Sequence, residues 1–348
     1  MKKYLLPNGI PYYKANLHSH STFSDGCRTP AEMKEDYKAR GYQILAFSDH
    51  DALHSHNDLT DESFLALTAY EISIRSDDDP TPHAFRKVVD LNLLADTPDA
   101  CVQVGYHPES VQWLIDRGKM TQAEVDAIRY AGDLRDMHYY PANINKIIRS
   151  ANENGFLVTI NHPAWSLTNF SDYGTYEGAW AVEIYNHGCR ALGGLYDSEQ
   201  VYDEILRSGK RLYAVATDDN HGTRDRFGGY IMVASPTLSY PDVIAALRTG
   251  KFYASCGPEI TELSYENGEV TLRCSPAQEI CMTTLGRRGA CVYDPADKLI
   301  TEAHFRIDPE LCGFVRFRVT DARGKNAWTN AYDVDSFMPE ARARRVIL

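Results

Sequence analysis

The chain has 348 residues, of which 43% are hydrophobic, and a formal net charge of −12. This composition supports a substantial folded core and excludes a disordered chain. The acidic balance disfavours binding to long nucleic acid or to an anionic membrane. A small anionic substrate stays possible, because bound metal ions reverse the local field.

The sequence predicts neither a membrane-spanning helix nor a secretory signal. No apolar run approaches the roughly 20 residues that a membrane helix needs, and the start, MKKYLLPNGI, has too short an apolar stretch for a secretory signal. The eight cysteines include no CxxC pair. We therefore expect reduced thiols in a cytoplasmic protein. The oligomeric state is left open.

Three apolar runs near the start of the chain each end in potential metal ligands. They are residues 12–21 with His18 and His20, residues 43–50 with His50, and residues 64–73 with Glu71. Between the first two, Thr29-Pro30 predicts the start of a helix and Gly41 its end. The order strand, helix, strand favours an α/β barrel with its site at the mouth.

The middle of the chain continues this alternation after a long insertion. Residues 83–94 have a strand-like pattern, and residues 108–153 look helical, with an insertion at about 108–131 that is either a lid or a packing decoration. From residue 156 the strand–helix rhythm resumes, with the strand-like segments FLVTINHP, WAVEIYNHG and RLYAVATDDNHG.

The pattern of apolar and polar residues changes beyond Gly257. Short alternating runs separated by Gly, Pro, Asn and Asp predict a small antiparallel domain, sandwich-like, over residues 258–348. Residues 1–257 would then form the α/β barrel. The second domain shows no cluster of acids and imidazoles, so we expect it to cover the barrel, to mediate oligomerisation or to bind part of a substrate.

Most of nine potential ligands lie where apolar runs end. Alternation along a strand puts both imidazoles of an HxH pair on one side, and a carboxylate at the end of a buried strand is costly unless it is paired or metal-bound. The nine predicted ligands are His18, His20, Asp25, His50, Glu71, His83, His162, Asp219 and His221. Such a nitrogen and oxygen set suits zinc, manganese or iron and indicates hydrolysis by activated water.

These residues lie in motifs that resemble the PHP (polymerase and histidinol phosphatase) superfamily of metal-dependent phosphoesterases. The motifs are LHSHSTFSDG, FSDHD, YEIS, INHP and TDDNHG. The phrases VEIYNHG and ALRTGKFYASCGP, followed by a β domain, are similar to the CehA/McbA-like subgroup. The resemblance implies a distorted (β/α)7 TIM-like barrel with its site at the carboxyl ends of the strands.

The same resemblance implies up to three divalent metals. The first would be held by His18, His20, Glu71 and Asp219, the second by Asp25, His50 and His221, and the third by Glu71, His83 and His162. Two positions stay open: His107 competes with His83, and Asp218 competes with Asp219.

Catalysis and substrate binding require further side chains. His221 or His187 would protonate the leaving group, and a positive side chain would bind an anionic substrate. The substrate candidates are Arg190, Arg224, Arg226, His54 and His56.

Three functions remain in competition at this point. The first is a phosphoesterase that acts on a small phosphorylated molecule or nucleotide through a di- or trinuclear site. The second is a metal-dependent hydrolase of a carbon ester, amide or carbamate. The third is a non-catalytic metal-binding module, against which the full ligand set argues.

Overall fold

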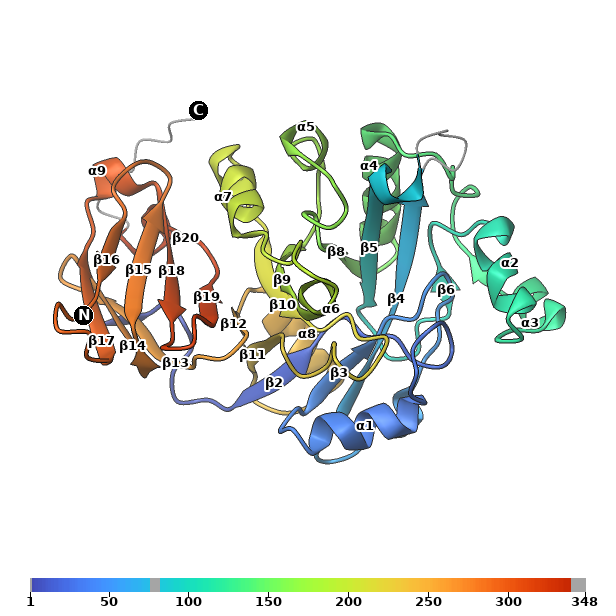
Figure 1. Cartoon of the computed structure of the whole chain (residues 1–348), viewed down its shortest axis with the longest axis horizontal. Helices are drawn as coiled ribbons and strands as arrows, with labels where there is room; N and C mark the ends of the chain where they lie inside the picture. The colour runs from blue at the N-terminus through green and yellow to red at the C-terminus, as the bar shows by residue number, and fades with distance from the viewer. Residues whose placement is uncertain (1, 76–81, 339–348) are drawn as a thin grey trace.

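A computed structural model describes residues 2–75 and 82–338 of the chain. A mixed α/β region carries most of the helices, and an all-β region, orange to red in Figure 1, lies beside it. One long sheet runs through both regions in the strand order β10-β9-β8-β5-β4-β3-β2-β11-β12-β19-β18-β15-β16. The two regions are therefore joined by backbone hydrogen bonds as well as by the connecting chain.

Seven neighbouring strands of this sheet surround the predicted site. They are β2 (Tyr12–Asn16), β3 (Ile44–Phe47), β4 (Leu65–Arg75), β5 (Val88–Ala95), β8 (Phe156–Ile160), β9 (Ala181–Asn186) and β10 (Tyr213–Thr217). Runs such as ILAF in β3 and FLVTI in β8 are wholly buried, as expected for strands covered on both faces.

The direction of these strands decides which residues meet. Strand β3 is parallel to β2 and β4, and β9 is parallel to β8 and β10. Strand β5 is antiparallel to both of its neighbours. The carboxyl ends of the parallel strands therefore share an edge with the amino end of β5.

The expected closed barrel is not present as a closed sheet. Strand β10 stands at the end of the ladder, because the free edge of β2 pairs instead with the antiparallel strand β11 (Tyr230–Ala234), which leads on through β12 (Phe252–Ser255). Near the site, an isolated bridge between Ser19 and Asn220 still links the segments that follow β2 and β10. The seven strands thus curve toward one another without forming a continuous ring.

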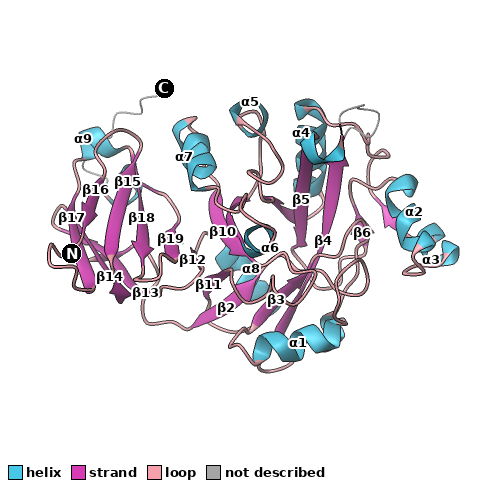
Figure 2. Ribbon diagram, viewed as in Figure 1, coloured by secondary structure: helices cyan, strands magenta, loops and turns pink. Residues whose placement is uncertain are grey.

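Helices cover the outer face of the sheet (Figure 2). The longer ones in this region are α1 (Pro30–Lys38), α4 (Pro141–Glu153), α7 (Glu199–Arg207) and α8 (Tyr240–Arg248). The predicted start of α1 is confirmed, with Thr29 and Glu32 forming a capping box. Apolar side chains on one face of α4, α7 and α8 are buried in the main core.

The insertion contains two helices and a small two-stranded sheet. Its elements are β6 (Val102–Gln103), α2 (Pro108–Asp116), α3 (Gln122–Asp126) and β7 (Arg129–Tyr130). The two helices share a separate small core that includes Ala52, and the Trp113 indole donates to Asp51 at 3.1 Å. The insertion therefore packs directly against the segment that follows His50.

The C-terminal region consists of two facing sheets with a core of their own. One sheet joins β1 (Lys3–Tyr4), β13 (Ile260–Glu266), β14 (Glu269–Ala277) and β17 (Ile300–Arg306). The other contains β15 (Glu279–Thr284), β16 (Ala290–Val292), β18 (Phe314–Thr320), β19 (Asn326–Thr329) and β20 (Tyr332–Asp333). The domain boundary at 257/258 stays a prediction, since β12 pairs with β19 across it and β1 joins the second region.

Short helices complete the described chain. They are η1 (Asn57–Leu59), η2 (His83–Phe85), α5 (Phe170–Tyr173), α6 (His187–Ala191), α9 (Pro309–Cys312) and α10 (Val334–Phe337). No helix within residues 2–75 and 82–338 is both long and apolar enough to span a membrane.

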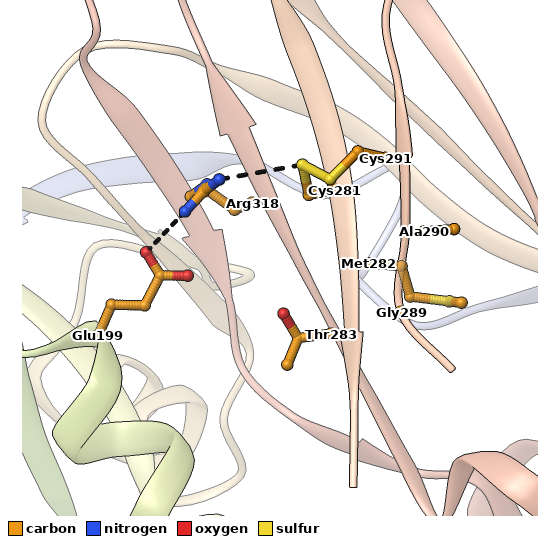
Figure 3. A pocket seen from close by; sticks show the side chains of 8 residues that line it. All are labelled: Glu199, Cys281, Met282, Thr283, Gly289, Ala290, Cys291 and Arg318. Carbon is orange, nitrogen blue, oxygen red and sulfur yellow. Dashed lines mark hydrogen bonds and ion pairs between the residues drawn. A yellow bond between two sulfur atoms is a disulfide. The ribbon is translucent and has the colours of Figure 1, made fainter. Parts of the chain in front are cut away.

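Cysteine pairing differs from the expectation of reduced thiols. Cys281 and Cys291, which are cross-strand neighbours on β15 and β16, form a disulfide. Figure 3 shows this disulfide beside Arg318, whose guanidinium also donates to Glu199 of α7 at 3.2 Å. The two cysteines are ten residues apart and form no CxxC motif; the register of β15 and β16 brings the two sulfurs together.

Candidate metal centre

Two histidines follow β2 and form the innermost part of the site. His18 and His20 are fully buried, and their Nε2 atoms lie 3.0 Å apart. Two imidazole lone pairs that face each other at this distance repel unless a proton or a metal ion lies between them. The pair thus has the geometry of two nitrogen donors aimed at one point.

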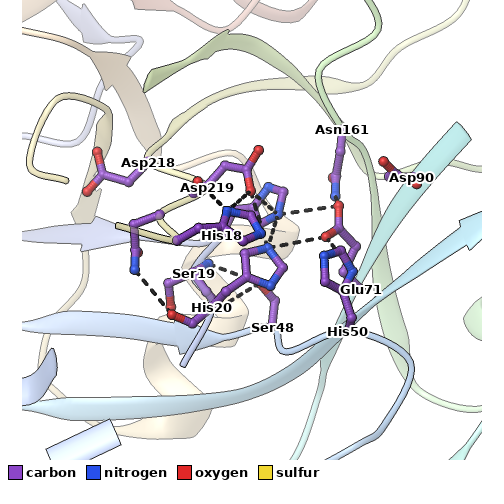
Figure 4. Close-up of polar contacts among 12 residues, drawn as sticks. His18, Ser19, His20, Ser48, His50, Glu71, Asp90, Asn161, Asp218 and Asp219 are labelled. Carbon is purple, nitrogen blue, oxygen red and sulfur yellow. Dashed lines mark hydrogen bonds and ion pairs between the residues drawn. The ribbon is translucent and has the colours of Figure 1, made fainter. Parts of the chain in front are cut away.

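Two carboxylates face these imidazoles from other strands (Figure 4). Asp219 Oδ1 lies 3.2 Å from the Nε2 atom of each histidine. Glu71 reaches His18 through Oε1 at 3.3 Å and His20 through Oε2 at 3.2 Å. This first group corresponds to the ligand set that the sequence predicts for one metal.

A second group lies on the other side of His20. Asp25 Oδ1 is 3.3 Å from His221 Nε2 and 3.9 Å from His50 Nε2. The His20 ring stacks against that of His50 and against that of His221, with centroids 4.4 and 4.2 Å apart. His20 belongs to this group as well as to the first. The structure therefore brings together the three predicted ligands of the second metal and adds His20 to them.

A third group contains a carboxylate that the sequence reasoning did not select. Asp90 Oδ2 lies 3.7 Å from His162 Nε2, and Glu71 Oε1 lies 3.6 Å from the same nitrogen. Asp90 reaches this point because β5 is antiparallel and begins at the edge where the other strands end.

Of the two histidines that the sequence offers as a ligand of the third metal, the structure describes the side chain of only one. His107 Nδ1 accepts the backbone N–H of Glu109 and thereby caps α2, and His107 is in none of the ligand groups found among the described residues. His83 lies in η2, but its side chain is outside the part of the chain that the structure describes. Asp90 is thus the carboxylate observed beside His162.

Hydrogen bonds from neighbouring residues hold the ligands in place. Glu183 accepts from His18 Nδ1 at 2.7 Å and from the His162 backbone N–H at 2.8 Å. Asn161 donates to Glu71 at 2.6 Å, and Asn186 donates to Asp219 at 3.1 Å. A carboxylate behind a ligand histidine fixes the tautomer whose other nitrogen faces the metal.

A buried aspartate organises the loop that carries Asp25. The Asp49 carboxylate accepts hydrogen bonds from the backbone and hydroxyl groups of both Ser21 and Ser24. A Cβ atom at Gly26 would lie 2.1 Å from the His20 carbonyl oxygen, so the turn accepts only glycine there. Asp49 therefore supports the site from behind and is not one of its ligands.

Asp218 has a similar supporting role, which separates it from Asp219. Its carboxylate accepts from the backbone N–H groups of Phe227, Gly228 and Gly229 and from the Tyr37 hydroxyl. It holds the loop after β10, while Asp219 faces the imidazoles. Burial raises the pKa of Asp218 to about 6.

Two ligand residues have a left-handed backbone that residues other than glycine seldom adopt. The φ angle is +28° at His162 and +52° at Asp219. Such conformations cost on the order of 1–3 kcal/mol each and persist where the surrounding structure imposes them. Here the Glu183 and Asn186 contacts described above hold both segments in place.

The electrostatics of the site favour a bound cation. Burial disfavours the charged form of His20, but Asp219 and Glu71 outweigh it and raise its pKa to about 10. Burial and the nearby Glu71 charge raise the pKa of Asp90 to about 7. Crowded carboxylates that raise the pKa values of neighbouring groups generate a negative potential, which a divalent cation neutralises.

One buried atom provides a direct test of whether the residues fit metal ions. His20 Nδ1 is buried and has no hydrogen-bond partner among the described residues, although Asp25 Oδ1 is 4.0 Å away. Buried polar atoms without a partner are rare in proteins. With Nε2 in the first group and Nδ1 facing the second, His20 is placed to contact two cations, and the donor set therefore fits metal binding.

Aromatic side chains border the ligands. The Trp165 ring lies edge-on to His162 with centroids 5.0 Å apart, and the Trp113 ring lies edge-on to His50 at 6.3 Å. Trp165 is 37% exposed. The rim of the site therefore offers apolar surface to the organic part of a substrate.

The predicted substrate residues divide into two sets. Arg226 forms an ion pair with Asp36, and His54 and His56 pack against Phe23. These three side chains therefore have contacts within the protein that account for their positions. Arg190 and Arg224 are exposed and make no side-chain hydrogen bond or ion pair within the described part of the chain.

His187 does not match the role of a free proton donor. Its Nδ1 atom is hydrogen-bonded to the Tyr185 hydroxyl at 2.9 Å, and it also forms a hydrogen bond with the backbone of Arg224. Burial, with the charges of Arg190 and Lys325, lowers its pKa. The imidazole is thus engaged in hydrogen bonds, and His187 belongs to none of the ligand groups found among the described residues.

Sequence reasoning missed Asp90 and Glu183, and both left the same signal. Each is an acid inside an otherwise apolar strand, in VVDLNLLA and AVEIYN. A buried carboxylate requires a partner, so these strand-interior acids were identifiable as site residues.

Comparisons with known proteins give distant structural similarities. No protein-family model matches the chain, and no curated protein matches it. A solved two-domain structure from Bacteroides vulgatus, described as containing a predicted PHP-like metal-dependent phosphoesterase, is 15% identical, with 95% of this chain and 98% of that chain covered and a TM-score of 0.42.

Two further solved structures align with a smaller part of the chain. A putative metal-dependent phosphoesterase from Bifidobacterium adolescentis is 16% identical, with 61% and 88% of the two chains covered and a TM-score of 0.36. An amidohydrolase from Chromobacterium violaceum is 17% identical, with 60% and 87% covered and a TM-score of 0.35. Because every one of these TM-scores is below 0.5, the inference of function rests on the ligand geometry of this chain.

Proposed function

We propose that this chain is a metal-dependent phosphoesterase that hydrolyses a phosphate ester of a small molecule at a site for two or three divalent cations. The observation that carries the proposal is the convergence of five imidazoles and four carboxylates around Glu71. These residues are His18, His20, Asp25, His50, Glu71, Asp90, His162, Asp219 and His221. The net charge of −12 makes a small anionic substrate a better candidate than a long nucleic acid.

The donor set narrows the choice of cation. Mixed imidazole and carboxylate donors suit zinc, manganese and iron, whereas calcium and magnesium prefer oxygen ligands. Glu71 contacts members of all three groups, so we assign it the role of a bridge between cations. Such cations, when bound, supply the activation of water and the neutralisation of phosphoryl charge that ester hydrolysis needs.

The residues of the chain position these cations and the substrate. Glu183 and Asn186 orient His18 and Asp219, and the Asp49 network fixes the loop of Asp25. In the overall reaction the oxygen of water bonds to phosphorus, the ester P–O bond breaks, and the leaving oxygen gains a proton. His221 is the most exposed imidazole of the ligand groups, with 38% of its side chain accessible, and lies where a substrate enters.

The test combines metal content with substrate specificity. Protein purified without added metal is analysed by elemental mass spectrometry and then assayed against phosphate monoesters, phosphate diesters, aryl carbamates and carboxylic esters. We expect two or three equivalents of zinc, manganese or iron per chain and fastest turnover of a phosphate ester. Faster turnover of carbamates or carboxylic esters would replace the phosphoesterase with a carbonyl hydrolase. Less than one metal equivalent after reloading would leave a binding module.

A further inference from the structure

The insertion, residues 102–130, contacts two of the segments that carry metal ligands. Its helices α2 and α3 lie at the end of the molecule opposite the C-terminal sheets (Figure 1). One segment, residues 21–25, ends in Asp25, and the other, residues 50–53, begins with His50. Both ligands belong to the second group. Contacts from the insertion to these segments therefore act on one part of the metal centre.

Asp51, the residue after His50, is held largely by the insertion. Its two carboxylate oxygens accept from Trp113 Nε1 at 3.1 Å and from Arg135 Nη2 at 3.4 Å. Its backbone carbonyl accepts from the side-chain amide of Gln103 at 3.0 Å. Three of the four polar atoms of Asp51 are thus bonded to the insertion or to the segment that follows β7.

The backbone conformation of this segment depends on such contacts. The φ angle of Asp51 is +63°, a left-handed conformation that a residue with a side chain adopts only where its surroundings impose it. The fourth polar atom of Asp51, its backbone N–H, donates to the Glu71 carbonyl at 2.8 Å. Ala52 is buried in the small core that α2 and α3 share. The insertion thus holds the segment that directs His50 into the site.

The loop of Asp25 is also bonded to the insertion. Lys119 lies between α2 and α3, and its amine donates to the Thr22 carbonyl at 3.0 Å. The Thr22 N–H donates in turn to the Arg28 carbonyl at 2.8 Å, which closes the loop that contains Asp25. The Lys119 backbone is itself fixed, because its N–H donates to the Leu114 carbonyl at 2.7 Å. One insertion therefore contacts the segments of two ligands that lie 50 − 25 positions apart in the chain.

We propose that the insertion is a clamp that sets the affinity of the second cation position by holding Asp25 and His50. Trp113 and Lys119 are its positioning residues. The inference rests on the metal centre of the proposed function and is independent of the substrate.

The exposure of the ligands explains why this position needs a clamp. The side chains of Asp25 and His50 are 31% and 20% exposed, whereas that of His18 is fully buried. Ligands that are less enclosed by the sheet depend more on neighbouring elements for their orientation. The contacts extend from Gln103 to Arg135, so they favour a fixed clamp over a lid that swings open.

A zinc titration compares variants that each remove one contact of the clamp. Metal-stripped protein is titrated in competition with a chromophoric chelator. Trp113→Phe removes the indole donor but keeps a ring, and Lys119→Met removes the amine but keeps an unbranched side chain. Each should weaken one zinc equivalent about tenfold, as expected for residues that support a ligand, and leave the others unchanged. Lys146→Met, which removes an exposed amine beside Asp133, is the matched control and should change none.

Replacing Asp25 by asparagine identifies the weakened equivalent. Asp25→Asn should itself lose the second cation, and adding Trp113→Phe should then leave the remaining affinities unchanged. A general structural role of Trp113 would weaken the remaining equivalents as well, because its effect would not depend on Asp25.

Hydrogen exchange measures the same coupling from the side of the insertion. By linkage, zinc must favour the state in which the insertion is in place. Zinc should therefore slow amide exchange of residues 102–130 in Lys119→Met protein, and Asp25→Asn should abolish this protection. Wild-type zinc affinities in both clamp variants, or no slowing of exchange, would overturn the clamp and leave the metal centre standing. If the clamp results hold but no phosphate ester is turned over, the phosphoesterase proposal fails and the clamp remains.

Discussion

Replacing Glu183 by glutamine tests whether the groups behind the ligands control metal binding. The two Glu183 oxygens accept four hydrogen bonds, from His18 Nδ1, Thr217 Oγ1, the His162 backbone N–H and Asn186 Nδ2, at 2.7–2.9 Å. Glutamine keeps the shape but has only one accepting oxygen. Its NH2 group must then face one of the two donor pairs.

The local geometry indicates which pair loses its acceptor. The His162 N–H and the Asn186 amide cannot become acceptors in place, whereas the Thr217 hydroxyl can rotate and the His18 imidazole can change tautomer. We therefore expect the glutamine NH2 group to face His18. The His18 ring proton then moves from Nδ1 to Nε2, so Nε2 no longer has a lone pair to offer to a metal ion. Losing one hydrogen bond to a charged group costs about 1.5–3 kcal/mol. That cost corresponds to about 10- to 100-fold weaker metal affinity, the usual effect of such supporting residues.

The measurement is a competition titration of metal-stripped protein against a chromophoric zinc chelator. Circular dichroism checks that the variant is folded, and Glu204→Gln, which alters a carboxylate on α7 that accepts from Tyr173, serves as the control. Zinc affinity of folded Glu183→Gln protein within twofold of wild type would refute the reasoning. It would show that His18 does not depend on Glu183 for its orientation.

Four further outcomes follow from the same geometry. Glu71→Ala should lose at least one metal equivalent and nearly all activity, and elemental analysis that shows full content would remove its bridging role. Asp90→Asn should lose one equivalent while His107→Ala keeps all of them; the reverse result would restore His107 as the ligand. In metal-free protein the pKa of His20 is raised to about 10, compared with about 6.5 in the unfolded chain. The protonated His20 imidazole therefore contributes its full stabilisation below pH 6.5, and this contribution is lost as the pH rises toward 10. Urea unfolding should therefore give a lower free energy at pH 9.5 than at pH 7, and a higher one would contradict the assignment. Arg316→Met leaves two carboxylates of α7 without their buried partner. The substitution should lower the free energy of unfolding by about 3 kcal/mol. A change below about 1 kcal/mol in the same assay would mean that the ion pairs between Arg316 and these carboxylates are solvated.

Much of the site was predictable because its residues follow strands that run in parallel. Apolar runs that end in His18, His50 and His162 placed these imidazoles at a common edge, and alternation placed His20 beside His18. The structure has all four within the ligand groups. Local periodicity was sufficient here, since the direction of each strand matched the expected strand–helix alternation.

The parts that were not predictable depend on pairing between distant strands. The acid inside the apolar strand VVDLNLLA indicates that Asp90 is buried with a partner, but not which partner. Asp90 meets His162 because β5 runs antiparallel to its neighbours, and no property of residues 83–94 alone indicates that direction. The sheet stays open because β11 takes the free edge of β2. Likewise, the Cys281–Cys291 disulfide depends on the pairing of β15 with β16 in one register, which the spacing of the two cysteines alone does not specify.

The short strand β1 sets an order of events during synthesis. Lys3 pairs with Tyr265, and Leu5 and Leu6 donate their backbone N–H groups to Leu263, so these residues find their partners only after the segment up to Tyr265 has been made. Strand β2 likewise lacks one of its partners until β11 has been made, since Tyr13 pairs with Val233. Contacts so far apart in sequence slow folding and leave apolar segments exposed in the meantime. An affinity tag or truncation at residues 1–6 would thus weaken the distant C-terminal sheet, although these residues lie far from it in sequence.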